Sequence, residues 1–155
     1  MTWKSIGVLV LWIALTFVAP ALGFRAKPDE WFASLTKPGF NPPSWVFAPV
    51  WTILYLLMAI ATWLVWRQGG WERQTFPLSL YLVQLVLNAA WTPLFFGAHR
   101  IGLALIDIVL QWLAIAATLF VFARVDALAA WLFVPYLAWV SFATVLNFEF
   151  WRRNA

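Results

Sequence analysis

Residues 44–67 read SWVFAPVWTILYLLMAIATWLVWR, an apolar run whose only charged side chain is Arg67, at its end. A helix needs roughly 20 residues at about 1.5 Å each to cross about 30 Å of hydrocarbon, so this run can span a bilayer. Four more apolar runs of similar length are predicted to do the same, at residues 4–24, 76–97, 101–123 and 128–151. We therefore expect an all-α integral membrane protein built as a bundle of five transmembrane helices.

The composition agrees with a membrane protein, since 65% of the residues are hydrophobic and 10% are charged, with a mean hydropathy of +0.84. Residues 1–155 are too few for more than a single membrane domain. Short links such as Gly69-Gly70 and His99-Arg100 predict antiparallel neighbouring helices. The net charge of +4 comes from scattered basic residues. We expect them to meet anionic lipid headgroups and expect no nucleic-acid partner.

The first apolar run has an alternative interpretation as a secretory signal, because Lys4 precedes it and Ala19-Pro20-Ala21 resembles a cleavage site. The run is longer than a typical signal core, and proline is unfavourable inside the cleavage motif. A transmembrane helix is therefore the preferred interpretation.

The orientation is predicted from the basic residues of the short loops. An odd number of spans places the termini on opposite sides of the membrane. One side then receives Lys4, Arg67, Arg73 and Arg124, and the other Arg25, Lys27, Lys37, Arg100, Arg152 and Arg153. The larger group predicts that the C-terminus and the first loop are cytoplasmic.

The first loop, residues 25–43, is long enough to suggest a function. The sequence from Pro28 to Trp31 predicts the start of a short helix, with Pro28 at an early helical position. Prolines at 38, 42 and 43 then hold the chain extended. We expect a stiff lid in which Trp31, Phe32 and Leu35 close over the bundle. The alternative is a loop that is rigid without covering anything.

The chain contains thirteen tryptophans. Five are predicted to lie at the membrane interfaces, where indole rings are favoured: Trp3, Trp66, Trp71, Trp131 and Trp151. Trp51, Trp91 and Trp139 instead fall inside apolar runs beside polar and aromatic residues. These three are predicted to line a buried site for a flat, apolar ligand.

Helical spacing groups the interior tryptophans with amides. One face of the third span carries Gln84, Asn88, Trp91 and Phe95, the second span carries Trp51, Tyr55 and Met58, and the fifth carries Trp139, Ala143, Leu146 and Asn147. Because an unpaired amide is costly in hydrocarbon, these faces should point into the bundle. Aromatic walls with a few fixed polar groups suit a planar ring system. Ordinary packing with interhelical amide bonds is the alternative.

Three spaced blocks carry a family resemblance: Trp31-x5-Lys37-Pro38-x3-Pro42-Pro43-x3-Phe47-x3-Trp51-x3-Tyr55, Asn88-x2-Trp91-x-Pro93-x-Phe95-Phe96-Gly97, and Pro135-Tyr136-x2-Trp139-x3-Ala143-x2-Leu146-Asn147. The chain resembles the translocator protein family (TspO/MBR), also called tryptophan-rich sensory proteins or peripheral benzodiazepine receptors. The resemblance implies a five-helix bundle, often dimeric, that binds porphyrins, haem, sterols and benzodiazepine-type drugs. It covers nearly the whole chain.

The resemblance also implies which residues form the cavity beneath the first loop: Trp31, Phe47, Trp51, Asn88, Trp91, Phe95, Trp139, Ala143, Leu146 and Asn147; Tyr55 shares their faces. It implies a light- or oxygen-dependent breakdown of porphyrin that involves Trp51 and Trp139. Sterol is a weaker expectation, because Phe148 and Phe150 stand where the cholesterol motif needs tyrosine. A bacterial cell envelope is the expected location.

Other polar residues are assigned simpler roles. Asp107 and Gln111 lie one turn apart, and we expect an interhelical hydrogen bond from Asp107 in preference to a proton relay. His99 is interpreted as a surface residue in preference to a haem ligand. Ala98-x3-Gly102 is a small-x3-small step that would suit a homodimer seam.

We find no metal-ligand cluster, Ser/His/Asp set or pair of carboxylates in the sequence, and expect no obligatory cofactor. The sequence thus favours a receptor or sensor that binds tetrapyrroles such as protoporphyrin IX. The alternative is a transporter of porphyrin, sterol or lipid, which would usually show an inverted repeat and broken helices.

Overall fold

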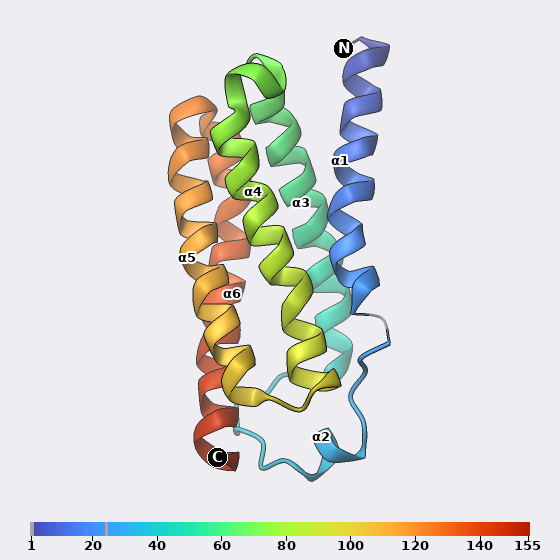
Figure 1. Ribbon diagram of the computed structural model, residues 1–155, viewed down its shortest axis with the longest axis vertical. Coiled ribbons are helices and arrows are strands. Elements are labelled where there is room, and N and C mark those ends of the chain that lie inside the picture. Colours follow the sequence, from blue (N-terminus) through green and yellow to red (C-terminus); the bar gives the residue numbers. More distant parts are fainter. Residues whose placement is uncertain (1, 24) are drawn as a thin grey trace.

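The computed structural model describes residues 2–23 and 25–155, and this part of the chain is helical without strands. Five long helices form the bundle in Figure 1: α1 (Trp3–Leu22), α3 (Phe47–Arg67), α4 (Gly70–Thr92), α5 (Ile101–Val125) and α6 (Ala127–Asn154). Together with the short segments that extend two of them, all five are long and apolar enough to cross a membrane. The predicted five-helix membrane bundle is confirmed.

The helices lie roughly parallel to one long axis, with the two chain ends at opposite ends of the bundle (Figure 1). α1 stands at one edge and packs against α3 and α4. α6 packs against both α3 and α5, while α4 contacts α3 and α5. This order brings α3, α4 and α6 around a shared interior, which is where the candidate site lies.

Helix boundaries follow backbone hydrogen bonding, and so they differ from the apolar runs. α4 begins at Gly70, six residues before the predicted start at Phe76. Its first turns carry polar residues such as Glu72 and Arg73, so they do not belong to the apolar run. It bends at Gln74, whose φ of −113° is not helical. Its far end continues into η2 (Pro93–Gly97), a π-helical segment. α5 and α6 likewise run past the predicted ends at 123 and 151.

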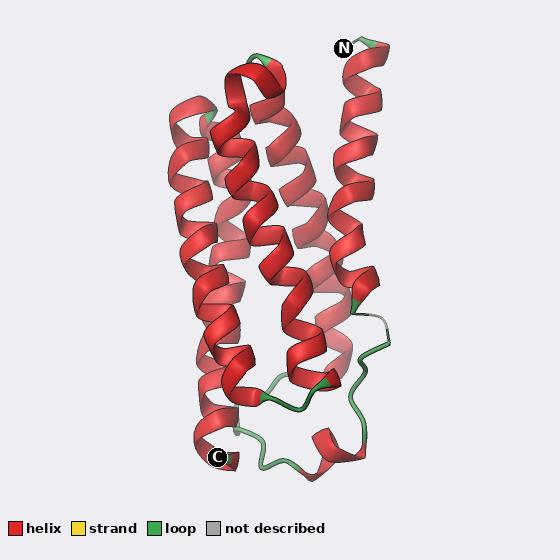
Figure 2. Cartoon of the chain, viewed as in Figure 1, coloured by secondary structure: helices red, strands yellow, loops and turns green. Residues whose placement is uncertain are grey.

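The first loop crosses the end of the bundle where the C-terminus lies, and Figure 2 shows it as a loop that contains one short helix. This helix, α2 (Glu30–Ser34), begins where the Asp29 carboxylate accepts a hydrogen bond from the Phe32 N–H at 3.1 Å. Pro28 therefore precedes the capping residue. The prediction that Pro28 occupies an early helical position is wrong. A single turn, η1 (Ser44–Val46), then leads into α3.

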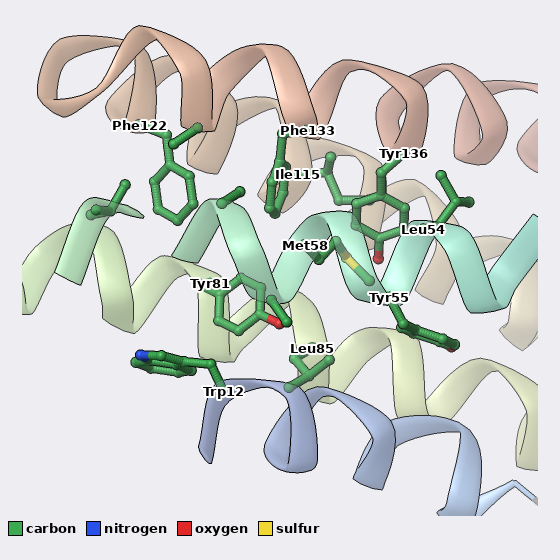
Figure 3. Close-up of a cluster of buried hydrophobic side chains, with 14 of the residues drawn as sticks. Trp12, Leu54, Tyr55, Met58, Tyr81, Leu85, Ile115, Phe122, Phe133 and Tyr136 are labelled. Carbon is green, nitrogen blue, oxygen red and sulfur yellow. The ribbon is translucent and has the colours of Figure 1, made fainter. Parts of the chain in front are cut away.

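The main core runs along the interior of the bundle. Figure 3 shows Phe122, Phe133 and Tyr81 packed between the helices with Met58 and Ile115. α1 is fixed to this core by Trp12, whose ring meets Tyr81 edge to face at 5.7 Å. The hydroxyls of Thr16 and Tyr81 form a buried hydrogen bond in the same place.

Tryptophans also mark the two ends of the bundle. Trp3 and Trp131 are 89% and 71% exposed at one end, where the exposed Trp71 also lies. Trp66, at the end of α3, is only partly exposed. The exposed Trp151 lies at the other end, near the C-terminus. This distribution fits the predicted interfacial belt.

The proposed dimer step Ala98-x3-Gly102 is not a helical step. Ala98 is the residue that ends η2, whereas Gly102 belongs to α5, so the helix is interrupted between them. A Cβ added at Gly102 would lie 3.4 Å from the Nε1 atom of Trp151 in the same chain. Gly102 therefore faces α6 of its own chain at ordinary contact distance. Homodimer formation stays a prediction.

Candidate ligand-binding site

A network of amides and tyrosines lies at the centre of the bundle. The Tyr136 hydroxyl donates to Oε1 of Gln84 at 2.8 Å and accepts from Nε2 of Gln111 at 2.8 Å and from Nδ2 of Asn88 at 3.1 Å. The Tyr55 hydroxyl donates to Oδ1 of Asn88 at 2.8 Å. The network joins α3, α4, α5 and α6, and it explains how these amides are accommodated in hydrocarbon.

Aromatic rings cover this network on the side of the lid. Trp51 stacks on Tyr55 with ring centroids 5.4 Å apart and meets Tyr136 edge to face at 6.2 Å. Trp139 meets Phe47 edge to face at 5.9 Å. The residues predicted from α3 and α6 therefore converge, and Ala143 packs against the same core.

A second layer lies closer to the lid. Trp91 stacks on Phe95 at 4.9 Å, and its indole N–H donates to Oδ1 of Asn147 at 2.9 Å. The Asn147 amide in turn donates to the carbonyl oxygen of Ile101 at 3.2 Å. Leu146 and Phe95 are buried in this layer, which also includes Phe47 and Trp31. Trp91 contacts both layers, so the predicted residues form one continuous aromatic region.

The rings of this region lie against one another, so a flat ligand can enter only when they separate. Two polar atoms in and beside this region have unused hydrogen-bonding capacity. The Nε1 atom of Trp139 and the Nε2 atom of Gln84 are buried, and neither has a hydrogen-bond partner in the described part of the chain. A buried donor without an acceptor is costly, and a bound polar atom would remove that cost.

The lid is anchored at the turn between α4 and α5. Trp31 lies edge to face with Phe95 at 6.0 Å and stacks on the His99 ring at 4.1 Å. Nε2 of His99 lies 3.0 Å from a carboxylate oxygen of Asp29. His99 has a φ of +55°, which is uncommon for a residue with a side chain. The amide N–H of Phe32 and then His99 hold the pKa of Asp29 below its ordinary value.

The second anchor of the lid is the end of α6. Phe32 packs against Phe96 at 5.1 Å and Phe150 at 5.7 Å. The Thr36 N–H donates to Oδ1 of Asn154 at 2.9 Å, and the Asn154 amide donates to the Thr36 carbonyl oxygen at 3.1 Å. The first loop thus closes the aromatic region from the C-terminal end of the bundle.

One expectation about a polar residue is wrong, and one important residue was missed. The Oδ2 atom of Asp107 is buried with no hydrogen-bond partner among the described residues, so the expected interhelical bond is wrong; Gln111 bonds to Tyr136 instead. Sequence reasoning also missed Tyr136 as the centre of the network. Its position three residues before Trp139 was the available signal, because that spacing places both on nearly one face.

Comparison with known proteins fits this architecture. Residues 6–152 match the model of the TspO/MBR family. The human translocator protein is 44% identical over 87% of this chain and 90% of its own length. The tryptophan-rich sensory protein of Cereibacter sphaeroides is 46% identical over 90% of both chains. Protein CrtK of Rhodobacter capsulatus is 38% identical over 97% of this chain and 94% of its own length. Because the match runs through all five membrane helices and the lid, this chain belongs to the TspO/MBR family.

Proposed function

We propose that the chain is a membrane receptor or sensor that binds a flat tetrapyrrole, such as protoporphyrin IX or haem, between α3, α4 and α6 under the lid. Other flat apolar molecules, including benzodiazepine-type drugs, would use the same place. The observation that carries the proposal is the convergence of Trp51, Trp91 and Trp139 beside the buried, unpartnered N–H of Trp139. The name "tryptophan-rich sensory protein" of one relative agrees with a sensing role.

The physical argument is an exchange of contacts. A planar ring system inserted between Trp51 and Trp139 replaces contacts between aromatic rings with contacts of the same kind. The ligand then gains a hydrogen bond from Trp139 if it presents an acceptor. The amide and tyrosine network behind these rings is internally bonded and can keep its shape. Closure of the lid excludes water from the bound ligand.

The test is a titration of purified protein with protoporphyrin IX, followed by the porphyrin absorbance. Trp139→Phe removes the indole N–H and part of the ring, and we expect affinity to fall roughly fivefold to tenfold, as for the loss of about 1 kcal/mol. Trp131→Phe is the matched control, because Trp131 lies on the same helix with 71% of its surface exposed. Equal affinity of the two variants would contradict the proposed site.

The same site would also support light-driven degradation of bound porphyrin. Excited porphyrin and oxygen supply the oxidising power, and the indoles of Trp51 and Trp139 donate electrons. We expect Trp51→Phe to slow the light-driven loss of porphyrin absorbance under oxygen, while Trp45→Phe, an exposed residue of η1, leaves the rate unchanged. Measurements in the dark and without oxygen provide the baseline. An unchanged rate in Trp51→Phe would refute this activity.

Proteoliposomes separate sensing from transport. Binding without movement of porphyrin across the bilayer supports a receptor. Saturable movement that depends on Trp51 would instead assign transport of porphyrin, and the same assay applies to sterol or lipid.

We further propose a cytoplasmic lid and C-terminus in a bacterial cell envelope. Arg25, Lys27 and Lys37 of the lid share one end of the bundle with Arg100, Arg152 and Arg153. Because the chain has no cysteine, a single cysteine at position 45 tests the side by labelling with an impermeant reagent. Homodimer formation remains a proposal that rests on the family resemblance, and cross-linking in the membrane tests it.

A further inference from the structure

A cavity lies outside the aromatic region. It has a volume of about 470 Å³ and is formed between the first turn of α5 and the last turn of α6, with part of the lid as a wall. Its lining is Trp31, Leu35, His99, Arg100, Ile101, Gly102, Leu103, Trp151, Asn154 and Ala155. Only Trp31 is shared with the predicted ligand site. The cavity is open on one side, at the end of the bundle that carries the lid.

The cavity contains one basic side chain without a partner among the described residues. Arg100 lies on its wall, and within residues 2–23 and 25–155 its side chain has no ion pair, hydrogen bond or ring contact. No carboxylate side chain lines the cavity. The nearby acid on α6, Glu149, is occupied by Arg152 at 2.8 Å and Arg153 at 3.1 Å. The amino end of α5 adds positive potential beside Arg100, while the carboxyl end of α6 on another wall adds negative potential. The free guanidinium of Arg100 is therefore the group that can pair with an anion.

The cavity also adjoins the lipid-facing surface. Leu103 lines it and is exposed, and Ile106 and Leu110 continue an exposed apolar column along α5 at helical spacing. Trp31 and the exposed Trp151 supply aromatic walls, which suit the headgroup region of a membrane. A cavity with one free arginine at a helix end thus continues into an apolar surface, and this combination matches a molecule with a charged head and an apolar tail.

We propose that this cavity binds the headgroup of an anionic phospholipid from the surrounding leaflet. The phosphate pairs with the guanidinium of Arg100, which presents two parallel donors to phosphate oxygens. The volume is within the range of small-molecule sites and suits a headgroup. The acyl chains lie outside it, along Leu103 and Ile106.

The test is native mass spectrometry of the full chain, purified in detergent and stripped of lipid, with added phosphatidylglycerol or phosphatidylcholine. We expect phosphatidylglycerol to bind in preference to phosphatidylcholine. Arg100→Gln should weaken phosphatidylglycerol binding about fivefold, the effect of one basic residue near an anionic headgroup. Arg100→Lys keeps the charge and should stay within about twofold.

Arg124→Gln is the matched control. Arg124 lies at the other end of α5, where its guanidinium covers the Phe120 ring at 4.5 Å. The substitution therefore removes the same charge at a place far from the cavity. We expect it to leave phosphatidylglycerol binding unchanged. An equal loss in Arg124→Gln and Arg100→Gln would overturn the proposal, because only net charge would then matter.

Two further outcomes would also overturn it. Displacement of phosphatidylglycerol by equimolar glycerol 3-phosphate would assign the cavity to a free phosphate compound. A dimer of lipid-free chains that Arg100→Gln abolishes would assign it to a second copy. Photo-crosslinkable phosphatidylglycerol gives an independent readout on the unmodified protein, with labels expected on residues 31–35, 99–103 or 151–155. Labels confined to other segments would contradict the site even if a variant failed to fold.

Discussion

Tyr136→Phe tests whether the buried polar network holds the four helices together. The substitution removes one hydroxyl from a side chain that is 0% exposed, and it creates almost no cavity. That hydroxyl makes hydrogen bonds with Gln84, Gln111 and Asn88. All three amides come from other helices, α4 and α5, so the loss falls on contacts between helices.

The expected magnitude follows from these three bonds. Hydrogen bonds between membrane helices contribute about 0.6 kcal/mol each on average, which gives about 2 kcal/mol for the hydroxyl of Tyr136. The substitution also leaves Oε1 of Gln84 without a donor. The Nε2 atom of Gln84 has no partner in the described part of the chain, so the whole buried amide would then be unpaired, which adds to the cost. We therefore expect the free energy of unfolding to fall by about 2 kcal/mol or more.

The assay is reversible unfolding in mixed micelles with increasing dodecyl sulfate, followed by circular dichroism. Tyr81→Phe is the matched control, because Tyr81 is equally buried in the bundle and its hydroxyl bonds to Thr16. We expect that variant to lose only about 0.6 kcal/mol. If Tyr136→Phe is no less stable than Tyr81→Phe, the network does not hold the bundle and the reasoning fails.

Three other predictions concern the lid and the packing of α1. First, the amides of residues 30–36 should lose their protection from hydrogen exchange, corrected for intrinsic rates, as the pH falls through the lowered pKa of Asp29. The charged carboxylate stabilises the lid fully above its ordinary pKa of about 4 and stops doing so once it is protonated. Protection that is unchanged down to pH 2 would contradict this. Second, Asn154→Ala removes both hydrogen bonds to Thr36 and should raise the open population of the lid about fivefold, from about 0.5 kcal/mol per exposed bond, measured by the same exchange. Arg153→Ala, beside it, is the control and should change nothing in the lid. Third, Gly23→Ala, at the C-cap of α1, places a Cβ 2.9 Å from Cβ of Thr92 and should destabilise the protein by about 1–3 kcal/mol, whereas Gly7→Ala, inside α1, meets nothing within 4 Å and should be neutral or stabilising. Equal stability of these two variants would refute the close contact of α1 with α4.

Part of the candidate site was predictable from spacing alone. Asn88 and Trp91 share a helical face with Gln84, and the high cost of unpaired amides in hydrocarbon implies that this face points inward. The structure bears this out, since Asn88 bonds to Tyr55 and Tyr136 inside the bundle. The partners themselves were not predictable. Periodicity gives the direction of a side chain about its own helix, but not which residue of another helix lies opposite.

Asp107 and His99 illustrate the same limit. Asp107 lies one turn from Gln111, yet Gln111 bonds to Tyr136, and Asp107 has no hydrogen-bond partner among residues 2–23 and 25–155. The relative rotation of α5 and α6 decides which side chain reaches the hydroxyl. His99 follows no helical pattern, and its contact with Asp29 joins residues 70 positions apart. A loop residue with a positive φ cannot be placed by spacing.

The sequence by itself determined the membrane class, the five spans and the presence of a short helix in the lid. These features depend on local physics: a bilayer needs long apolar helices, and acidic residues favour the start of a helix. Only the tertiary structure decided that Tyr136 is the centre of the polar network and that Arg100 lines a cavity with Trp151. Both results depend on how helices that are distant in sequence are rotated and placed against one another, and hydropathy and spacing contain no information about that arrangement.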